Sequence, residues 1–142
     1  MNPLTTAITE AKNGDSKLIL IIGKPGSGKS KLIHEYSKET GIPILDFDQI
    51  FKGKVTQIQR VMQDFLDNYD NEVLLIDNKK ILYAKNSNID MLSFLKELTK
   101  KVVVVATWNG TVEDNKLIHI RSKLPANLVY SLDHENIKII EC

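Results

Sequence analysis

Hydrophobic residues gather in four short runs that are apolar almost throughout. The runs are KLILII, IPILDF, EVLLID and VVVVAT, at residues 17–22, 42–47, 72–77 and 102–107. Each has the length of a β-strand, and an unbroken apolar run of this length is typical of a strand that is covered on both faces. The pattern therefore predicts four buried strands in a sheet with a layer on each side.

Between these runs, the hydrophobic positions change to the spacing of amphipathic helices. The helical stripes are Leu4, Ala7, Ile8 and Ala11; Leu32, Ile33 and Tyr36; Val55, Ile58, Met62, Phe65, Leu66 and Tyr69; and Met91, Leu92, Leu95 and Leu98. Gly14 and Gly41 are predicted to end the first two helices. Segments 116–122, 128–132 and 137–141 of the tail are predicted to be short strands joined by turns.

Strands that alternate with helices predict a three-layer α/β domain with a mostly parallel sheet of about five strands. A length of 142 residues fits one such domain over residues 1–142. Ligands of such sheets lie at the carboxyl ends of the strands. Candidate chemistry is therefore expected where the apolar runs end.

Charge, cysteine content and the distribution of apolar residues indicate which partners and which cellular location to expect. The net charge is +1, so no strong basic field favours nucleic acid, and any contact with DNA is expected to be indirect or weak. Cys142 is the only cysteine, which argues against a disulfide framework and a cysteine zinc site. No apolar run has the length that spans a membrane, and the segment MNPLTTAITEAKNGD lacks the features of a signal peptide. These features predict a cytoplasmic protein that does not bind membranes.

The segment GKPGSGKS follows the first apolar run directly. Its spacing, Gly23-x-x-x-x-Gly28-Lys29-Ser30, is that of the phosphate loop, or Walker A motif, and predicts a P-loop NTPase fold. Glycines let backbone N–H groups approach phosphate oxygens, and the next helix presents its positive end to the same anion. Lys29 is expected to bridge the β- and γ-phosphates of ATP, and the Ser30 hydroxyl to bind Mg²⁺. The residues predicted to contact the nucleotide are Gly23, Pro25, Gly26, Ser27, Gly28, Lys29, Ser30 and Lys31.

A carboxylate for the metal follows the third apolar run. Asp77 is expected at the end of that strand, the position of a Walker B aspartate, so Ser30 and Asp77 are the predicted Mg²⁺ residues. The structural alternative is that Asp77 only caps the turn after the strand. The next residue is Asn78, whose amide can orient a water molecule but cannot remove its proton at neutral pH. Hydrolysis by this chain alone is therefore expected to be slow, unless another carboxylate, such as Asp46 or Asp48, or a partner provides the base.

Polar residues that suit the same edge of the sheet follow the fourth run. Thr107 and Asn109 are expected at the end of that strand, where they would sense the γ-phosphate or hold the attacking water; the alternative is a simple turn before Gly110. An arginine finger, if one is needed, would be Arg60, Arg121 or an arginine of another subunit. The predicted catalytic residues are Lys29, Asp77, Asn78, Thr107 and Asn109.

A competing constellation follows the second run. Asp46 and Asp48, in ILDFDQIF, are spaced so that both side chains lie on one side of an extended segment. This looks like the D-x-D of shikimate-kinase-like small-molecule kinases, in which one aspartate helps the metal and the other receives the substrate. Such kinases grip their substrates with several guanidinium groups, whereas this chain has only Arg60 and Arg121. The two aspartates could also merely cap the next turn.

Other polar and aromatic residues give weaker signals. His34, His119 and His134 have no metal-ligand spacing, and we expect them to be surface or hydrogen-bonded polar groups. Trp108 is expected to be a core residue rather than a platform for stacking on a base. The stripe from Val55 to Tyr69 is expected to pack in the core, with a partner surface as the alternative.

The segments LILIIGKPGSGKSKL, EVLLIDNKKILY and KKVVVVATWNG, followed by a β-rich tail, resemble the BrxF family. These are small P-loop proteins of bacteriophage exclusion (BREX) defence systems. The resemblance runs from about Lys17 to the end of the chain, and LLIDN and ATWNG carry it, because the phosphate loop is common to a whole superfamily. Asparagine also follows the strand-end aspartate in the family pattern, so Asn78 fits it. The segment LIHIRSKLPANLVYSL, which contains Arg121, departs from that pattern.

The resemblance implies an ATP-binding accessory component of an antiphage system that acts with larger proteins, including a methyltransferase and a predicted ATPase. The expected activity is a slow or partner-stimulated ATPase that works as a nucleotide switch, with the loop after Thr107 as the candidate contact of the γ-phosphate. Expected partners are other BREX proteins, with self-association as an alternative. A small-molecule kinase and a module that binds ATP without turnover are the competing hypotheses.

Overall fold

The computed structural model of the chain describes residues 3–14, 16–24, 28–46, 58–78, 91–119, 128–131 and 137–141. Several residues singled out in the sequence lie outside this part of the chain. They are Pro25, Gly26, Ser27, Asp48, Arg121 and His134.

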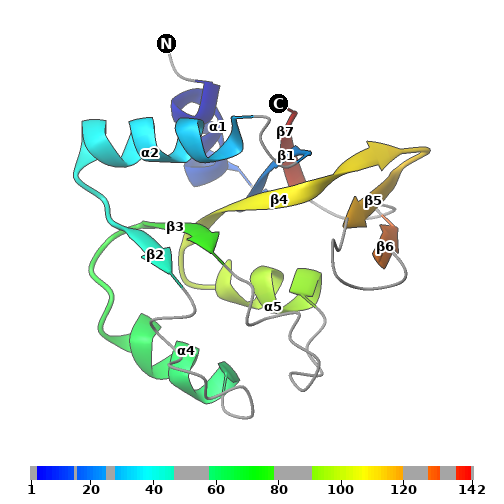
Figure 1. Cartoon of the computed structure of the whole chain (residues 1–142). Helices are drawn as coiled ribbons and strands as arrows, with labels where there is room; N and C mark the ends of the chain where they lie inside the picture. Colours follow the sequence, from blue (N-terminus) through cyan, green and yellow to red (C-terminus); the bar gives the residue numbers. More distant parts are fainter. Residues whose placement is uncertain are drawn as a thin grey trace.

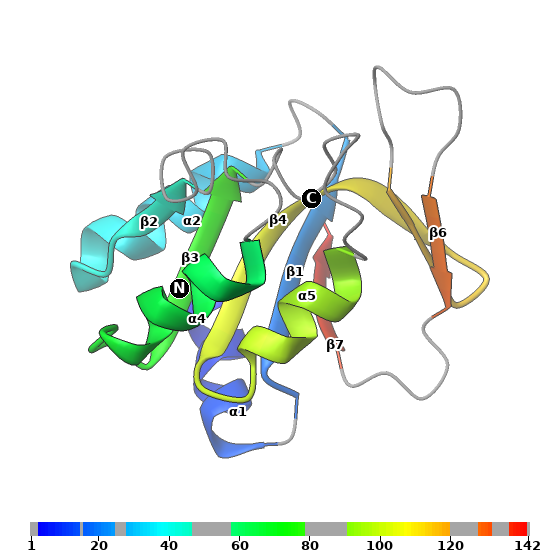
Figure 2. The same ribbon diagram turned by 90° about the horizontal axis from the view of Figure 1, so that it is seen from below.

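Five parallel strands form the centre of the fold (Figures 1 and 2). They are β1 (Leu18–Gly23), β2 (Ile44–Asp46), β3 (Val73–Asn78), β4 (Val103–Glu113) and β7 (Ile137–Glu141). Their order across the sheet is β2-β3-β4-β1-β7. The prediction of a mostly parallel sheet of about five strands is therefore confirmed. The order also places β4 between β1, which precedes the glycine loop, and β3, which carries Asp77.

Helices cover both faces of this sheet. Helices α1 (Pro3–Asn13) and α2 (Lys29–Thr40) lie on one face, and α4 (Ile58–Asp67) and α5 (Met91–Leu98) lie on the other (Figure 1). Gly41, with φ of 78°, ends α2 in the left-handed conformation that was expected of a C-terminal glycine. The three-layer α/β architecture predicted from the alternation of elements is therefore present. None of the described helices has the length and apolar character needed to cross a membrane.

The burial of β1 explains why the first run has no polar position. Leu18, Leu20 and Ile22 pack in the core under α4 and α5, whereas Ile19 and Ile21 pack in the core under α1 and α2. All five side chains are at most 2% exposed. Because successive residues of a strand face opposite sides, a strand between two helical layers must be apolar at every position.

Strand β4 extends further than its sequence indicated. The expected strand ended at residue 107, but β4 continues to Glu113 and turns into an antiparallel ribbon with β5 (Lys116–His119) and β6 (Leu128–Ser131). Asp114 and Asn115 connect β4 and β5 with positive φ angles of 50° and 60°, as in a type I′ hairpin turn. The alternative of a turn before Gly110 is therefore wrong. The segment after Thr107, expected to be a loop, is a strand, and its contact with the γ-phosphate stays a prediction.

Tertiary contacts explain why the strand does not end at the polar residues. Trp108 is fully buried, as predicted, and its Nε1 donates a hydrogen bond to the Ile118 carbonyl at 3.2 Å. Gly110 pairs with His119 in the ribbon. A Cβ atom at Gly110 would lie 1.8 Å from the Ile118 carbonyl oxygen, so the glycine permits a close approach of two strands rather than a turn.

We expect Gly110→Ala to lower the free energy of unfolding by about 3 kcal/mol, because its methyl group collides with backbone that cannot move aside cheaply. Gly41→Ala is the matched control, since its Cβ would meet open space and only its φ of 78° is unfavourable, at about 1 kcal/mol. Urea denaturation of both variants measures the difference. Equal destabilisation would contradict the steric role of Gly110.

Candidate functional site

The candidate site lies at the carboxyl ends of β1 and β3, beside the point where β4 leaves the parallel sheet. In the register of β1 with β4, Ile21 lies opposite Thr107 and Gly23 lies opposite Asn109. Asp77 is the penultimate residue of β3, on the other side of β4. The strand order therefore brings the start of the glycine loop, Thr107 and Asp77 to one edge of the sheet.

Two hydroxyl groups converge on the Asp77 carboxylate. Ser30 Oγ, at the start of α2, lies 3.1 Å from Asp77 Oδ1 and donates a hydrogen bond to it. Thr107 Oγ1 lies 3.0 Å from the Asp77 main-chain oxygen and 3.1 Å from Oδ1. Thr107 is 5% exposed, and the Asp77 side chain is 25% exposed. One oxygen of the carboxylate is thus fixed from inside the protein while the group remains accessible to solvent.

His34 belongs to the same cluster, which the sequence analysis missed. Its Nε2 lies 3.4 Å from Asp77 Oδ2, an ion-pair distance if the imidazole is protonated, and the side chain is 64% exposed. The exposure agrees with the expected surface position. The sequence feature that could have predicted the position of His34 beside Asp77 is its spacing of four residues from Ser30, because residues i and i+4 lie on one face of a helix.

Lys29 is held against the glycine loop. It is 7% exposed, and its Nζ donates a hydrogen bond to the Lys24 carbonyl oxygen at 2.9 Å. A buried ammonium group needs such acceptors because its removal from water is costly. Gly28 precedes the helix with φ of 101°, a conformation that side chains disfavour, and provides no side-chain cap for the first N–H groups of α2. The geometry fits the binding of an anion at this end of α2.

The other predicted site residues occupy less central or undescribed positions. Gly23 is buried in β1 and Asn109 is half-buried opposite it, whereas Lys31 is exposed on α2. The backbone of Asn78 ends β3, but its side chain lies outside the described structure. Pro25 to Ser27 of the loop also lie outside it. The part of the site that the structure describes is therefore formed by α2, β3 and β4.

Asp46 lies on the strand next to Asp77, on the side of β3 that is away from β4. It ends β2, at the edge of the parallel sheet, and pairs in register with Asn78. Three strand intervals separate β2 from β1, which corresponds to about 14 Å between their backbones. Asp46 thus lies beside β3 rather than beside the glycine loop. Asp48, the other half of the kinase-like pair, falls outside the described residues.

The oxygens of Ser30 and Asp77 suit a Mg²⁺ ion. Two adjacent ligands of an octahedral Mg²⁺, each about 2.1 Å from the metal, are about 3 Å apart, which is close to the measured 3.1 Å. No group of three histidine, cysteine, aspartate or glutamate residues that could hold a metal occurs in the described ranges. A Mg²⁺ ion that arrives with a nucleotide does not need one, because phosphate oxygens and water provide most of its ligands.

Comparison with known proteins adds no family assignment. The chain matches no protein-family model, and no curated protein is significantly similar to it. The arrangement of the site and the motifs in the sequence therefore carry the functional argument.

We expect Thr107→Val to weaken Mg²⁺ binding about tenfold in the presence of a nucleotide, because the variant keeps the shape of a strand residue but no longer orients Asp77 Oδ1. Mg²⁺ titration of nucleotide binding by calorimetry measures the effect. Thr40→Val is the control, since it also removes a hydroxyl that donates to a carbonyl, that of Tyr36, but lies at the other end of α2. If Thr107→Val lowers thermal stability but leaves the Mg²⁺ affinity unchanged, Thr107 only links β3 and β4 and does not orient Asp77 for the metal.

Proposed function

We propose that this protein binds a Mg²⁺–nucleoside triphosphate, with ATP as the expected ligand, and acts as a slow or partner-stimulated ATPase that switches its partner contacts with the bound nucleotide. The observation that supports the proposal is the 3.1 Å contact between Ser30 Oγ and Asp77 Oδ1. These residues are 47 positions apart in the sequence, and each was assigned to Mg²⁺ from a separate motif. A turn-capping aspartate would not need to meet the serine of the glycine loop.

In this proposal Lys29, Ser30, Asp77 and Thr107 each have a specific role in binding the nucleotide and its metal. Backbone N–H groups at the start of α2 bind the phosphates, and the Lys29 ammonium exchanges the Lys24 carbonyl for phosphate oxygens. Ser30 and Asp77 hold the Mg²⁺ ion, directly or through its water ligands, and Thr107 fixes the orientation of Asp77. The metal, when bound, neutralises the charge that develops on the phosphates during transfer.

Slow turnover follows from the residue after Asp77. Asn78 cannot accept the proton of an attacking water, so general-base catalysis from this position is absent from the proposal. Asn109, opposite Gly23 in the register, is placed to hydrogen-bond a phosphate or a water at the same edge. A partner that supplies a base or an arginine would accelerate hydrolysis, and such dependence is the basis of a switch.

The assignment to phage defence rests on the resemblance of the sequence to the BrxF family. Under this proposal the protein acts in the cytoplasm with other BREX proteins. The small-molecule kinase is the less suitable alternative because such enzymes grip their substrates with several guanidinium groups, whereas this chain has only Arg60 and Arg121.

We expect Lys29→Met to weaken ATP binding about a hundredfold or more, because the buried stem of the side chain is kept while its charged hydrogen bonds to phosphate are lost. Lys38→Met, an exposed residue in the last turn of the same helix, is the control for the change of charge. Calorimetry measures affinity, and circular dichroism verifies the fold. Unchanged ATP affinity in folded Lys29→Met would refute the site.

Turnover assays separate the competing functions. The purified chain is expected to release phosphate from ATP at well below about 1 s⁻¹, the low end of ordinary enzymes, and to be stimulated by a partner protein or by DNA. ADP formation that depends on a hydroxylated metabolite would instead identify a kinase. ATP binding without turnover under any condition would identify a module that only holds the nucleotide.

A further inference from the structure

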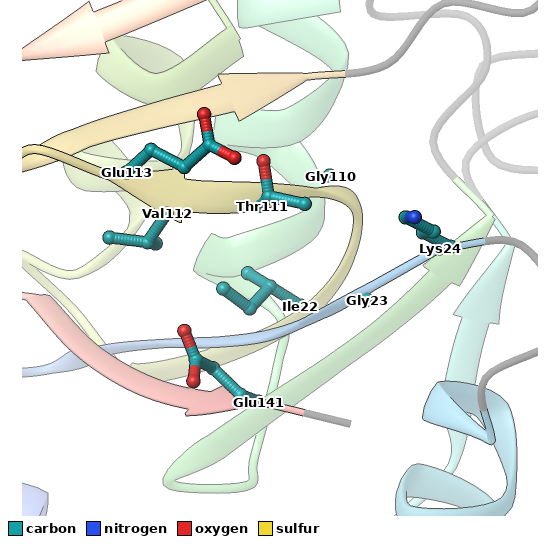
Figure 3. A pocket seen from close by; sticks show the side chains of 8 residues that line it. All are labelled: Ile22, Gly23, Lys24, Gly110, Thr111, Val112, Glu113 and Glu141. Carbon is teal, nitrogen blue, oxygen red and sulfur yellow. The ribbon is translucent and has the colours of Figure 1, made fainter.

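A hollow lies beside the glycine loop, on the side away from Asp77. It is formed by the end of β1, the continuation of β4 beyond the parallel sheet and the end of β7 (Figure 3). Its volume is about 420 Å³, within the range of about 300–1,000 Å³ that is usual for small-molecule sites. The space lies where β4 leaves the parallel sheet after its last pairing with β1, at Asn109, and continues into the antiparallel ribbon (Figure 2).

The lining of the hollow combines two carboxylates with apolar side chains. Figure 3 shows Glu113 on β4 and Glu141 on β7 on two sides of the space, with Ile22 and Val112 between them. Because Lys24 also lines the hollow, the net charge of the lining is −1, from two carboxylates and one ammonium group. A negative lining opposes the entry of a phosphate group, and its carboxylates favour neutral groups that donate hydrogen bonds. The apolar side chains suit a flat or weakly polar ring system. This is the chemistry of a nucleoside rather than of its phosphates.

The hollow and the proposed phosphate site share one residue, Lys24. The main-chain oxygen of this residue accepts the hydrogen bond from Lys29 Nζ at 2.9 Å, while the residue itself lines the hollow. Asp77 on β3 and Glu141 on β7 lie on opposite sides of β1 and β4. Three strand intervals, about 14 Å, separate those outer strands, a span that an extended nucleoside triphosphate can bridge.

We propose that the hollow binds the nucleoside end of the ligand, and that the carboxylates of Glu113 and Glu141 accept hydrogen bonds from its ribose hydroxyls. This inference rests on the proposed function, because it takes the phosphates to lie at Lys29 and Ser30. The terminal phosphate then points toward Asp77, and the ribose and base lie between β1, β4 and β7. Carboxylates bind ribose hydroxyls in the same way in dinucleotide-binding folds.

The test uses the full chain and compares four ligands with Mg²⁺: ATP, 2′-deoxyATP, purine riboside triphosphate, which lacks the amino group of the base, and inorganic tripolyphosphate. The variants are Glu113→Gln, Glu141→Gln and the double variant. The control is the double variant Glu39→Gln/Glu97→Gln, which removes the same charge at exposed positions of α2 and α5. All of these substitutions are at exposed residues, and circular dichroism verifies folding.

We expect the wild-type chain to bind ATP at least tenfold more tightly than tripolyphosphate, and 2′-deoxyATP about tenfold more weakly than ATP, from the loss of one charge-assisted hydrogen bond. The double variant should lose this preference for ATP over tripolyphosphate, and the control should keep it. Purine riboside triphosphate should bind like ATP; a selective loss for this ligand would instead assign the carboxylates to the base and overturn the ribose contact.

Failure of this inference differs from failure of the proposed function. If tripolyphosphate binds but the double variant keeps the full affinity for ATP, the hollow is not the nucleoside site, whereas the phosphate site stands. If the wild-type chain binds neither ATP nor tripolyphosphate, both proposals are overturned.

Discussion

The position of β4 between β1 and β3 is the constraint on which the candidate site depends. It places the Thr107 hydroxyl within 3.1 Å of Asp77 Oδ1. It also sets the distance between β1 and β3, so that Ser30, at the start of the helix that follows β1, reaches the same oxygen of Asp77. Both neighbours of β4 are parallel to it, so β1 and β3 end at the same edge, on either side of the middle of β4. A different strand order with the same local elements would separate these groups by a strand width or more, about 5 Å.

The buried sheet makes this edge rigid. Strands β1, β3 and β4 are packed between two helical layers, and the side chains of residues 18–22, 73–76 and 103–106 are almost completely excluded from solvent. Interiors of this density resist displacement, so the strand ends hold Asp77 and Thr107 at fixed positions. Lys29 and Ser30 are instead carried by α2, whose first turn follows the glycine loop. Ligand binding can therefore be accommodated on the loop and helix side while the carboxylate side remains in place.

Strand β4 also connects the two ends of the proposed ligand. Its middle provides Thr107 beside the metal residues, and its continuation provides Glu113 beside the hollow. The same strand then forms the ribbon with β5 and β6, which projects to one side of the parallel sheet (Figure 2). Under both proposals, β4 supports the metal end of the ligand through Thr107 and contacts its ribose through Glu113.

The sequence by itself determined the class of fold and most of the elements, because these depend on local patterns of apolar runs and helical spacing. It also predicted that Ser30 and Asp77 lie together, and they are 3.1 Å apart. It did not determine the length of β4, since the pairing of Gly110 with His119 and the contact of Trp108 with Ile118 form only when the ribbon folds back. Nor did it identify His34 or the hollow with Glu113 and Glu141. These sites join residues from separate elements, and only the strand order decides which distant side chains become neighbours.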